Sequence, residues 1–280
     1  MKVYISADIE GITGLVSWAQ CGRADGQHYD FPFARRMMTH DVNAAIRGAR
    51  AAGATSILVK DAHGNSKSLL ADELEPGTEL FSGLGSGIDG MMQGLDSSFD
   101  AAFLVGYHAM AGTLGGIMEH TITGGIHRLS INGVPSGEMS LSAGVAGLYG
   151  VPLVMVSSDK AGCAEASSFW PWVRTAVVKE GIGRYMGRLL HPSDTGPLIE
   201  RAASNALENL SSARSWIVDE PATIRIEFNR AEEADICMRI VGVTRIDAYT
   251  VETTHSTYAD AHQAAWSMFG LSGVGLRSNE

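Results

Sequence analysis

Residues 1–14 read MKVYISADIEGITG, and this stretch decides what kind of fold the chain can adopt. It opens with the β-branched, aromatic and long apolar side chains of a buried strand. Asp8 and Glu10 follow directly. Because residues two apart in an extended chain point to the same side, both carboxylates can face one site, where they need a cation between them. In the alternative, Asp8 caps a turn by accepting backbone N–H groups and Glu10 is solvated. These residues alone leave both interpretations open.

The composition is that of a globular protein with an ordinary core. Of the 280 residues, 45% are hydrophobic and 19% are charged, which argues against a disordered chain and is enough for one large α/β domain or two smaller ones. No stretch reaches the length of a membrane span. The first residues turn polar too early for the apolar core of a signal peptide. We therefore expect a cytoplasmic protein.

Charge and cysteine content exclude several classes of partner and site. A formal net charge of −10 disfavours nucleic acids and anionic membranes as partners, because an acidic surface cannot neutralise phosphates. Cys21, Cys163 and Cys237 are odd in number, far apart and without CxxC spacing. This pattern argues against a disulfide framework and against a thiolate zinc site. We expect the three thiols to be buried as small hydrophobic groups.

The next segments predict a parallel sheet. Residues 33–53 carry apolar or small side chains at the i, i+3, i+4 spacing of an amphipathic helix, which Gly53 ends. A continuous apolar strand follows at 56–60 and ends in Asp61, Ala62 and His63. A strand, a helix and a strand within about sixty residues form a βαβ unit, which places helices on both faces of a parallel sheet.

Two further strands and a hairpin extend this pattern. Residues 101–108 and 152–159 are apolar throughout, as in strands that are buried on both faces. Between them, Asn132-Gly133 predicts a tight antiparallel hairpin. Residues 139–149 are small and apolar at helical spacing and predict a closely packed helix.

The pattern changes after His191-Pro192, so we place a domain boundary near residue 190. Beyond it we expect a helix capped by Ser193 or Asp194, two half-exposed antiparallel strands and a final helix, after which the chain end is frayed. These elements are predicted at 194–209, 222–228, 245–253 and 256–270. The predicted fold is α/β, with a mostly parallel central sheet sandwiched by helices in residues 1–190 and a smaller α+β domain in residues 191–280.

Polar residues follow three of the predicted parallel strands. Ligands of open α/β sheets collect at the carboxyl ends of the strands. Those ends carry Asp8 and Glu10 after the first strand, Asp61 and His63 after the second, and His108 after a later one. Carboxylates and imidazoles are ligands of zinc, manganese and cobalt. Asp8, with two oxygens, could bridge a pair of ions.

Additional candidates lie in the loop and hairpin that follow. They are Glu119, His120, His127 and Glu138. A single histidine is more often structural than functional, and His127 is followed by the basic Arg128. For the remaining histidines a structural role is favoured: His28, His40, His191, His255 and His262.

One competing motif lies at residues 85–90, where GSGIDG satisfies the GxGxxG pattern of dinucleotide-binding loops. That pattern requires a long helix to open at the third glycine, but Gly94 interrupts the segment within a turn. The motif also lies outside the first βαβ unit. We interpret these glycines as the turn of a surface loop.

The chain resembles a known family in several motifs that occur in the same order. SADIEG (6–11) resembles the opening signature of the zinc-dependent D-aminopeptidases of bacterial dipeptide-transport operons. The resemblance continues in LVKDAHG (58–64), FLVGYHAMAGT (103–113), GGIMEHTITGG (115–125) and INGVPSGEMSLSAGVAGLYGVPLVMVSSD (131–159). Several spaced motifs in order are more specific than any one of them.

The resemblance implies a role for each matching residue. Asp8 would bridge two zinc ions, with Glu10 and His108 at one ion and His63 and Glu138 at the other. His120 falls where the family has its catalytic histidine. From its position two residues before His63, Asp61 is a candidate to orient a ligand imidazole.

The implied activity is hydrolysis of short peptides with an N-terminal D-residue, of the D-alanine type, by water that two zinc ions per subunit activate. The family also implies a homo-oligomer, a ring-shaped decamer, in which residues 191–280 could serve assembly and substrate access. The residues leave two alternatives open: another binuclear metallohydrolase such as a phosphoesterase, and a non-enzymatic peptide-binding ring protein.

Overall fold

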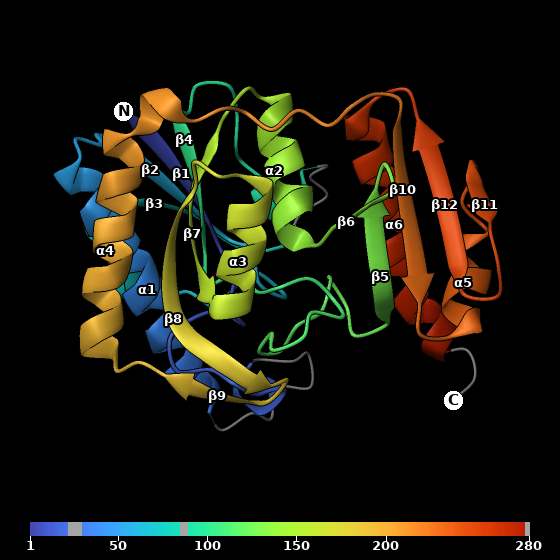
Figure 1. The fold of residues 1–280 in the computed structure, drawn as a ribbon, viewed down its shortest axis with the longest axis horizontal. Coiled ribbons are helices and arrows are strands. Elements are labelled where there is room, and N and C mark those ends of the chain that lie inside the picture. The colour runs from blue at the N-terminus through green and yellow to red at the C-terminus, as the bar shows by residue number, and fades with distance from the viewer. Residues whose placement is uncertain (22–29, 85–88, 278–280) are drawn as a thin grey trace.

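Two β-sheets with helices packed on them make up the structure, a computed structural model that describes residues 1–21, 30–84 and 89–277 (Figure 1). The first sheet has seven strands in the order β3-β2-β1-β4-β7-β8-β9. All of its neighbouring strands are parallel except β8 and β9. Its strands are β1 (Lys2–Ala7), β2 (Ser56–Asp61), β3 (Glu79–Phe81), β4 (Ala101–Val105), β7 (Leu153–Asp159), β8 (Arg174–Gly183) and β9 (Met186–Leu189). The predicted mostly parallel central sheet is therefore confirmed.

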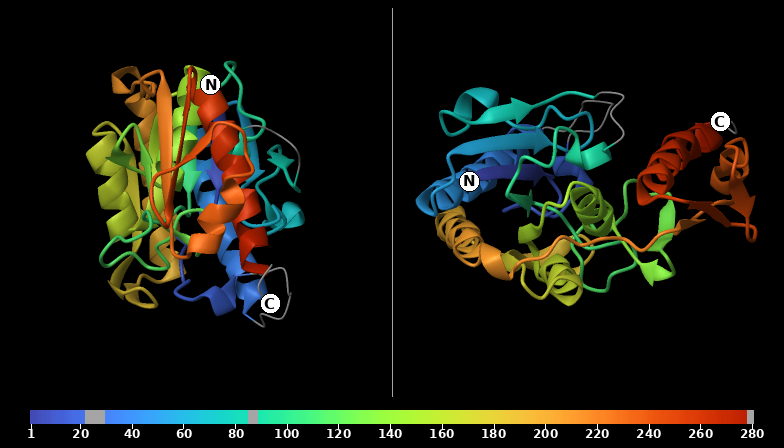
Figure 2. Two further views of the ribbon diagram at one scale, coloured as in Figure 1. Left: turned by 90° about the vertical axis from the view of Figure 1, so that its right-hand side faces the viewer. Right: turned by 90° about the horizontal axis from the view of Figure 1, so that it is seen from above.

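Helices cover both faces of this sheet, as Figures 1 and 2 show. One face carries α1 (Phe31–Ala51) and α4 (Pro192–Glu208), and the other carries α2 (Glu138–Leu148) and α3 (Lys160–Phe169). The strands alternate accordingly. Val3 of β1 packs into the core with α1 and α4, whereas Tyr4 packs into the core that contains α2. This alternation explains why both faces of the strand are apolar.

The second sheet has five antiparallel strands in the order β11-β12-β10-β5-β6. Helix α6 packs between this sheet and α2 (Figure 1), where the Tyr258 hydroxyl donates to the Leu141 carbonyl oxygen at 3.0 Å. The elements are β5 (Ile126–Ile131), β6 (Val134–Pro135), β10 (Ala222–Phe228), α5 (Ala231–Cys237), β11 (Val243–Arg245), β12 (Thr250–His255) and α6 (Tyr258–Arg277). Short 3-10 helices are η1 (Trp18–Gln20), η2 (Ala71–Glu73), η3 (Gly90–Met92) and η4 (Leu210–Ser212).

The two sheets do not divide the chain at residue 190. The hairpin at Asn132-Gly133 forms as predicted, with φ angles of 50° and 79°, but its strands β5 and β6 join the second sheet. Helix α4, which follows residue 190, belongs to the first layer. It lies so close to α1 that a Cβ on Gly48 would be 2.2 Å from the Glu200 carbonyl oxygen. The smaller unit is thus assembled from two separate segments.

Several predicted element ends move in the structure. His191, and not Ser193 or Asp194, caps α4, because its ring nitrogen accepts the Ser193 N–H and Pro192 occupies the first turn. The strand predicted at 245–253 is split into β11 and β12. Helix α6 continues past Gly270 to Arg277. The elements β8, β9, α3 and α5 were not predicted at all. No helix in the described part of the chain combines the length and the apolar character of a membrane span.

Candidate metal centre

The carboxyl ends of three neighbouring parallel strands bring the predicted ligands to one edge of the first sheet. Strand β1 lies between β2 and β4. Ala7, at the end of β1, is opposite Asp61 of β2 and Val105 of β4. The segments that carry Asp8 and His108 therefore leave the sheet side by side, as the strand-end argument predicts.

Two glycines allow these segments to stay together beyond the sheet. Gly106 has a φ of +73°, and a Cβ there would lie 2.4 Å from the carbonyl oxygen of Asp8. A Cβ on Gly11 would lie 1.7 Å from the carbonyl oxygen of Tyr107. The Gly11 N–H donates to the Gly106 carbonyl oxygen at 2.7 Å. Any larger residue would push the segments apart, so the approach of Asp8 to His108 depends on both glycines.

Glu138 reaches the same place from the first turn of α2. Its Oε1 accepts the backbone N–H of Ile122 at 2.6 Å, which ties the loop containing His120 to the helix. The preceding Gly137 lies against Met110, where a Cβ would be 2.6 Å from the Met110 Cβ. The helix layer thus adds a carboxylate to the groups that the strands supply.

The imidazole of His108 lies at the centre of one group of contacts. Its Nε2 is 3.5 Å from Oδ2 of Asp8 and 3.3 Å from Oε1 of Glu138. Nε2 of His120 is 3.6 Å from the same Glu138 oxygen. The rings of His108 and His120 stack with centroids 4.0 Å apart. All four side chains are buried.

A second group of contacts joins Glu10 to His63, whose Nε2 is 3.4 Å from Oε1 of Glu10. Of the two pairings that the family resemblance implies, Glu10 with His108 matches a close set of ligand atoms, whereas Glu138, paired there with His63, contacts His108. Among the described residues, three sets have ligand atoms within 4.8 Å of one another: Asp8, Glu10 and His108; His108, His120 and Glu138; Glu10, Cys21 and His63.

The separations fit ligands that share a divalent cation. Two ligand atoms at about 2.0–2.1 Å from a tetrahedral zinc ion lie about 3.4 Å from each other, and the contacts above measure 3.3 to 3.6 Å. In the described part of the chain, Oδ2 of Asp8 and Nε2 of His108 are buried without a hydrogen-bond partner. Because unpaired buried polar atoms are costly, the residues present fit a bound metal.

Hydrogen bonds at Nδ1 orient the rings toward the centre. Nδ1 of His108 lies 3.0 Å from the Ala109 carbonyl oxygen, and Nδ1 of His120 lies 2.9 Å from that of Met118. A carbonyl oxygen can only accept, so each Nδ1 carries the proton and each Nε2 presents its lone pair to the cluster. Both imidazoles are thus prepared to bind a metal or to accept a proton.

Hydrogen bonds connect Asp61 to His63 through the following loop. Oδ2 of Asp61 accepts the backbone N–H groups of Ser68 and Leu69 at 2.6 and 2.7 Å. The Ser68 hydroxyl, in turn, contacts Nδ1 of His63 at 3.1 Å. Asp61 thus supports the orientation of the imidazole by shaping the loop whose serine touches the ring.

Burial and mutual charge shift the pKa values within the cluster. Burial, followed by the charges of Glu10 and Glu138, raises the pKa of Asp8 well above its usual value. The pKa of His108 is raised well above its usual value, because the attraction of Glu138 and Asp8 outweighs burial. Burial and the neighbouring His108 lower the pKa of His120. Several carboxyl and imidazole groups that compete for protons are typical of a site built for a cation or for proton transfer.

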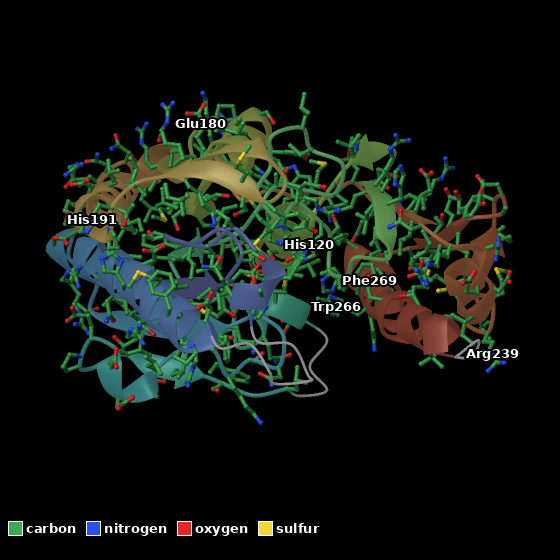
Figure 3. All side chains as sticks on the ribbon, turned by 90° about the horizontal axis from the view of Figure 1, so that it is seen from below. His120, Glu180, His191, Arg239, Trp266 and Phe269 are labelled. Carbon is green, nitrogen blue, oxygen red and sulfur yellow. The ribbon has the colours of Figure 1, made fainter. Side chains whose placement is uncertain are left out.

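The cluster opens into a cavity of about 540 Å³ whose walls sequence reasoning missed. Trp18 packs edge-on against His120, with ring centroids 4.8 Å apart, and donates its indole N–H to the Tyr185 hydroxyl at 3.0 Å. Tyr185 comes from the unpredicted β8–β9 hairpin, and Trp266 comes from α6 of the second unit. In Figure 3, His120 and Trp266 lie near one another, whereas His191 lies far away. The positions of strand ends do not predict these cavity residues, because they belong to other elements of the fold.

The other candidates lie outside the cluster. Glu119 forms an ion pair with Arg184 at 3.3 Å, and His127 is exposed on β5. For the GxGxxG motif, residues 85–88 lie outside the described residues, and η3 is a helix of only three residues in place of the long helix required. The three cysteines are buried as expected, and none of them forms a disulfide within the described residues. Cys21 differs from the expectation in one respect, because its sulfur lies near Glu10 and His63.

A buried lysine fixes the loop that carries Glu10. Nζ of Lys179, in β8, donates to the carbonyl oxygens of Glu10 and Leu15 at 2.6 and 2.7 Å. Burial lowers the pKa of Lys179 to about 8. Since β8 was not predicted from the sequence, the contact of Lys179 with the Glu10 loop was not predicted either.

Replacing Lys179 by methionine is expected to lower the free energy of unfolding by about 2–6 kcal/mol, because each buried carbonyl left unpaired costs about 1–3 kcal/mol. Chemical denaturation of the purified variant measures this change. Lys160→Met is the matched control, because Lys160 is exposed and pairs only with Glu180 at the surface. Equal stability of the two variants would contradict the anchoring role.

Comparisons with known proteins all point to one family. The model of a peptidase family described as D-aminopeptidase matches residues 1–267. A D-aminopeptidase of Bacillus subtilis (strain 168) is 33% identical over 272 residues, which cover 97% of each chain. A solved structure, the Zn-dependent D-aminopeptidase DppA from Bacillus subtilis, described as a self-compartmentalizing protease, superimposes with a TM-score of 0.93 at 33% identity over 98% of each chain.

Proposed function

Because the chain belongs to the D-aminopeptidase family, we propose that it removes the N-terminal residue of short peptides when that residue is a D-amino acid such as D-alanine. The observation that carries the proposal is the buried cluster in which Oδ2 of Asp8 and Nε2 of His108 face each other without a hydrogen-bond partner among the described residues. Preference for the D-configuration is supported by the family alone.

Two zinc ions per chain are proposed for this cluster. One position among Asp8, Glu10 and His108 is supported by ligand atoms that lie within 4.8 Å of one another. The family resemblance implies His63 and Glu138 for the second. Asp8 would be shared, since it has two carboxylate oxygens. Zinc is favoured because the relative of known structure is zinc-dependent. When bound, such ions lower the pKa of water and polarise a carbonyl group.

His120 is proposed as the catalytic acid and base. Its Nδ1–H is engaged by the Met118 carbonyl oxygen, so its Nε2 is free to accept a proton from the attacking water and to return it to the leaving amine. Trp18 holds the ring from one side and His108 stacks on the other. Both contacts restrict the ring to an orientation in which Nε2 faces the cavity.

We further propose that the protein works in the cytoplasm as a homo-oligomer, a ring-shaped decamer, in which residues 191–280 contribute to assembly and access. The description of the Bacillus subtilis structure as self-compartmentalizing supports an enclosed assembly. Light scattering in solution tests this, and a monomer would contradict it.

Activity measurements on chromogenic substrates test the function. We expect the purified protein to hydrolyse D-alanine p-nitroanilide at least about tenfold faster than the L-isomer, the discrimination that one well-shaped pocket can supply. A chelator should abolish this activity, and zinc should restore it. Chelator-resistant turnover, or cleavage of p-nitrophenyl phosphate but of neither anilide, would remove the proposal.

A further inference from the structure

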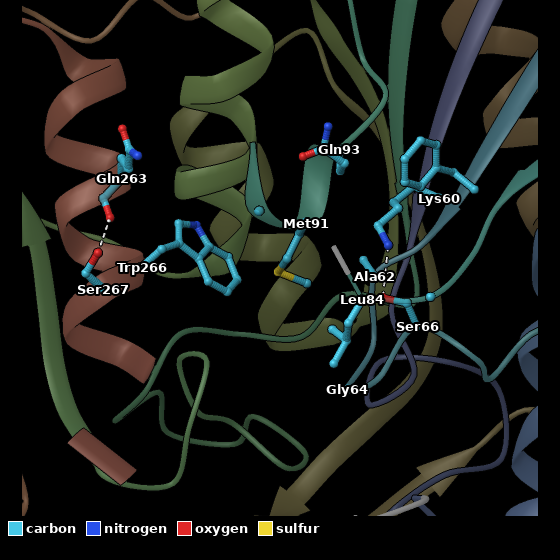
Figure 4. A pocket seen from close by; sticks show the side chains of 13 residues that line it. Lys60, Ala62, Gly64, Ser66, Leu84, Met91, Gln93, Gln263, Trp266 and Ser267 are labelled. Carbon is cyan, nitrogen blue, oxygen red and sulfur yellow. Dashed lines mark hydrogen bonds between the residues drawn. The ribbon is translucent and has the colours of Figure 1, made fainter. Parts of the chain in front are cut away.

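A second cavity, of about 390 Å³, adjoins the metal cavity. Figure 4 shows it between the end of β2 and helix α6. The two cavities share four lining residues: Ala62, Gly64, Met91 and Trp266. A ligand held at the metal centre can therefore extend past Met91 and Trp266 into this second space.

The side chain of Lys60 lies in the wall of the second cavity. It is 4% exposed, and its Nζ donates to the Ser66 hydroxyl at 2.9 Å, the bond drawn in Figure 4. An ammonium group has three N–H donors, and within the described ranges no carboxylate lies within ion-pair distance of this one. Phe81 covers it, with Nζ 5.5 Å from the ring centroid. A buried cation with a neutral partner is costly unless an anion joins it.

The nearest carboxylate in the sequence does not fill this role. Asp61 follows Lys60, but its Oδ2 accepts two backbone N–H groups of the next loop. A further polar group of the wall is also unpaired: Oε1 of Gln93 is buried without a partner. An amide can reverse to present its NH₂ group, so Gln93 could donate to an anion in the cavity.

We propose that this second cavity binds the C-terminal carboxylate of a short peptide, with Lys60 as its counter-charge. The inference rests on the proposed peptidase function and adds a substrate class to it: peptides short enough for the N-terminus to lie at the metal centre while the free carboxylate reaches Lys60. Such a contact selects di- and tripeptides over longer chains and over blocked C-termini.

Hydrolysis of D-alanyl-glycine and of its C-terminal amide tests the proposal. The wild type should cleave the free acid with a kcat/KM about tenfold to a hundredfold higher than the amide, the range expected for a charge-assisted contact in a desolvated site. In Lys60→Met this ratio should fall toward one, chiefly through the KM of the acid. Lys60→Arg should keep most of the preference because it keeps the charge.

Lys67→Met is the matched control, because Lys67 is exposed on the loop that follows β2 and its replacement should leave the ratio unchanged. Zinc content and unfolding curves establish that each variant is folded. Equal cleavage of acid and amide by the wild type, or an unchanged ratio in folded Lys60→Met, overturns the carboxylate site. Failure of the wild type on every D-peptide and anilide would instead overturn the proposed function, so the two results are distinguishable.

Discussion

Asp8→Asn is expected to lose both equivalents of zinc together and to lower kcat/KM by about a thousandfold or more. Asp8 lies two residues before Glu10 and contacts His108, and its two oxygens can serve both proposed metal positions, so its removal affects both. A metal contribution of several kcal/mol corresponds to a factor of this size. Elemental analysis of the purified variant measures the zinc content directly.

Asp41→Asn is the matched control for loss of a buried carboxylate. Asp41 is fully buried and accepts hydrogen bonds from Thr13, away from the cluster. It should lose stability and keep both zinc ions. If Asp8→Asn instead retains one equivalent, Asp8 is a ligand of a single ion. If it retains both and loses only about 1 kcal/mol of stability, Asp8 is an ordinary turn cap.

His120→Asn is expected to reduce kcat by about 10²–10⁴-fold, the usual contribution of a positioned acid or base, while zinc content stays at the wild-type value. We expect the rate to fall without loss of zinc because of where His120 lies. His120 contacts Glu138 at 3.6 Å but stands at the cavity wall beneath Trp18, whereas His108 lies deeper, between Asp8 and Glu138. Steady-state kinetics together with elemental analysis measure both quantities.

His127→Asn serves as the control, since His127 is exposed on β5 and should tolerate the change. A zinc content that falls in His120→Asn would make His120 a ligand rather than a proton carrier. Full activity with full zinc content would remove it from the mechanism.

Four of the six proposed site residues could be predicted from local signals in the sequence: Asp8, Glu10, His63 and His108. Asp8, His63 and His108 follow apolar strands, and a parallel sheet aligns strand ends whatever the details of packing. Glu138 and His120 follow no such strand. The sequence offered them as candidates beside Glu119 and His127, and only the family resemblance gave them roles, because a helix start and a loop carry no signal of what they face.

The arrangement within the cluster was not predictable. Sequence spacing gives no distance between His63 and Glu10. Of the pairings implied by resemblance, Glu10 with His108 matches a close set of ligand atoms, whereas Glu138 contacts His108 in place of His63. The same holds for Lys179, whose ammonium group reaches the Glu10 carbonyl from a strand more than 160 residues away in the chain. The spacing of apolar residues along the chain predicts neither contact, because each contact depends on which strands pair with each other in the sheet.

The sequence by itself determined the class of fold and the types of side chain that could bind a metal. The spacing of apolar residues indicates which residues are buried, and the strand ends indicate where polar side chains collect. Only the tertiary structure decided which elements pack against one another. It joined the β5–β6 hairpin to β10 and returned α4 to α1, so that no single boundary at residue 190 separates the sheets. It also placed Lys60 beside the metal cavity. The physical reason is that the spacing of apolar residues indicates which side chains are buried but not which element packs against them. That element comes from residues distant in the chain.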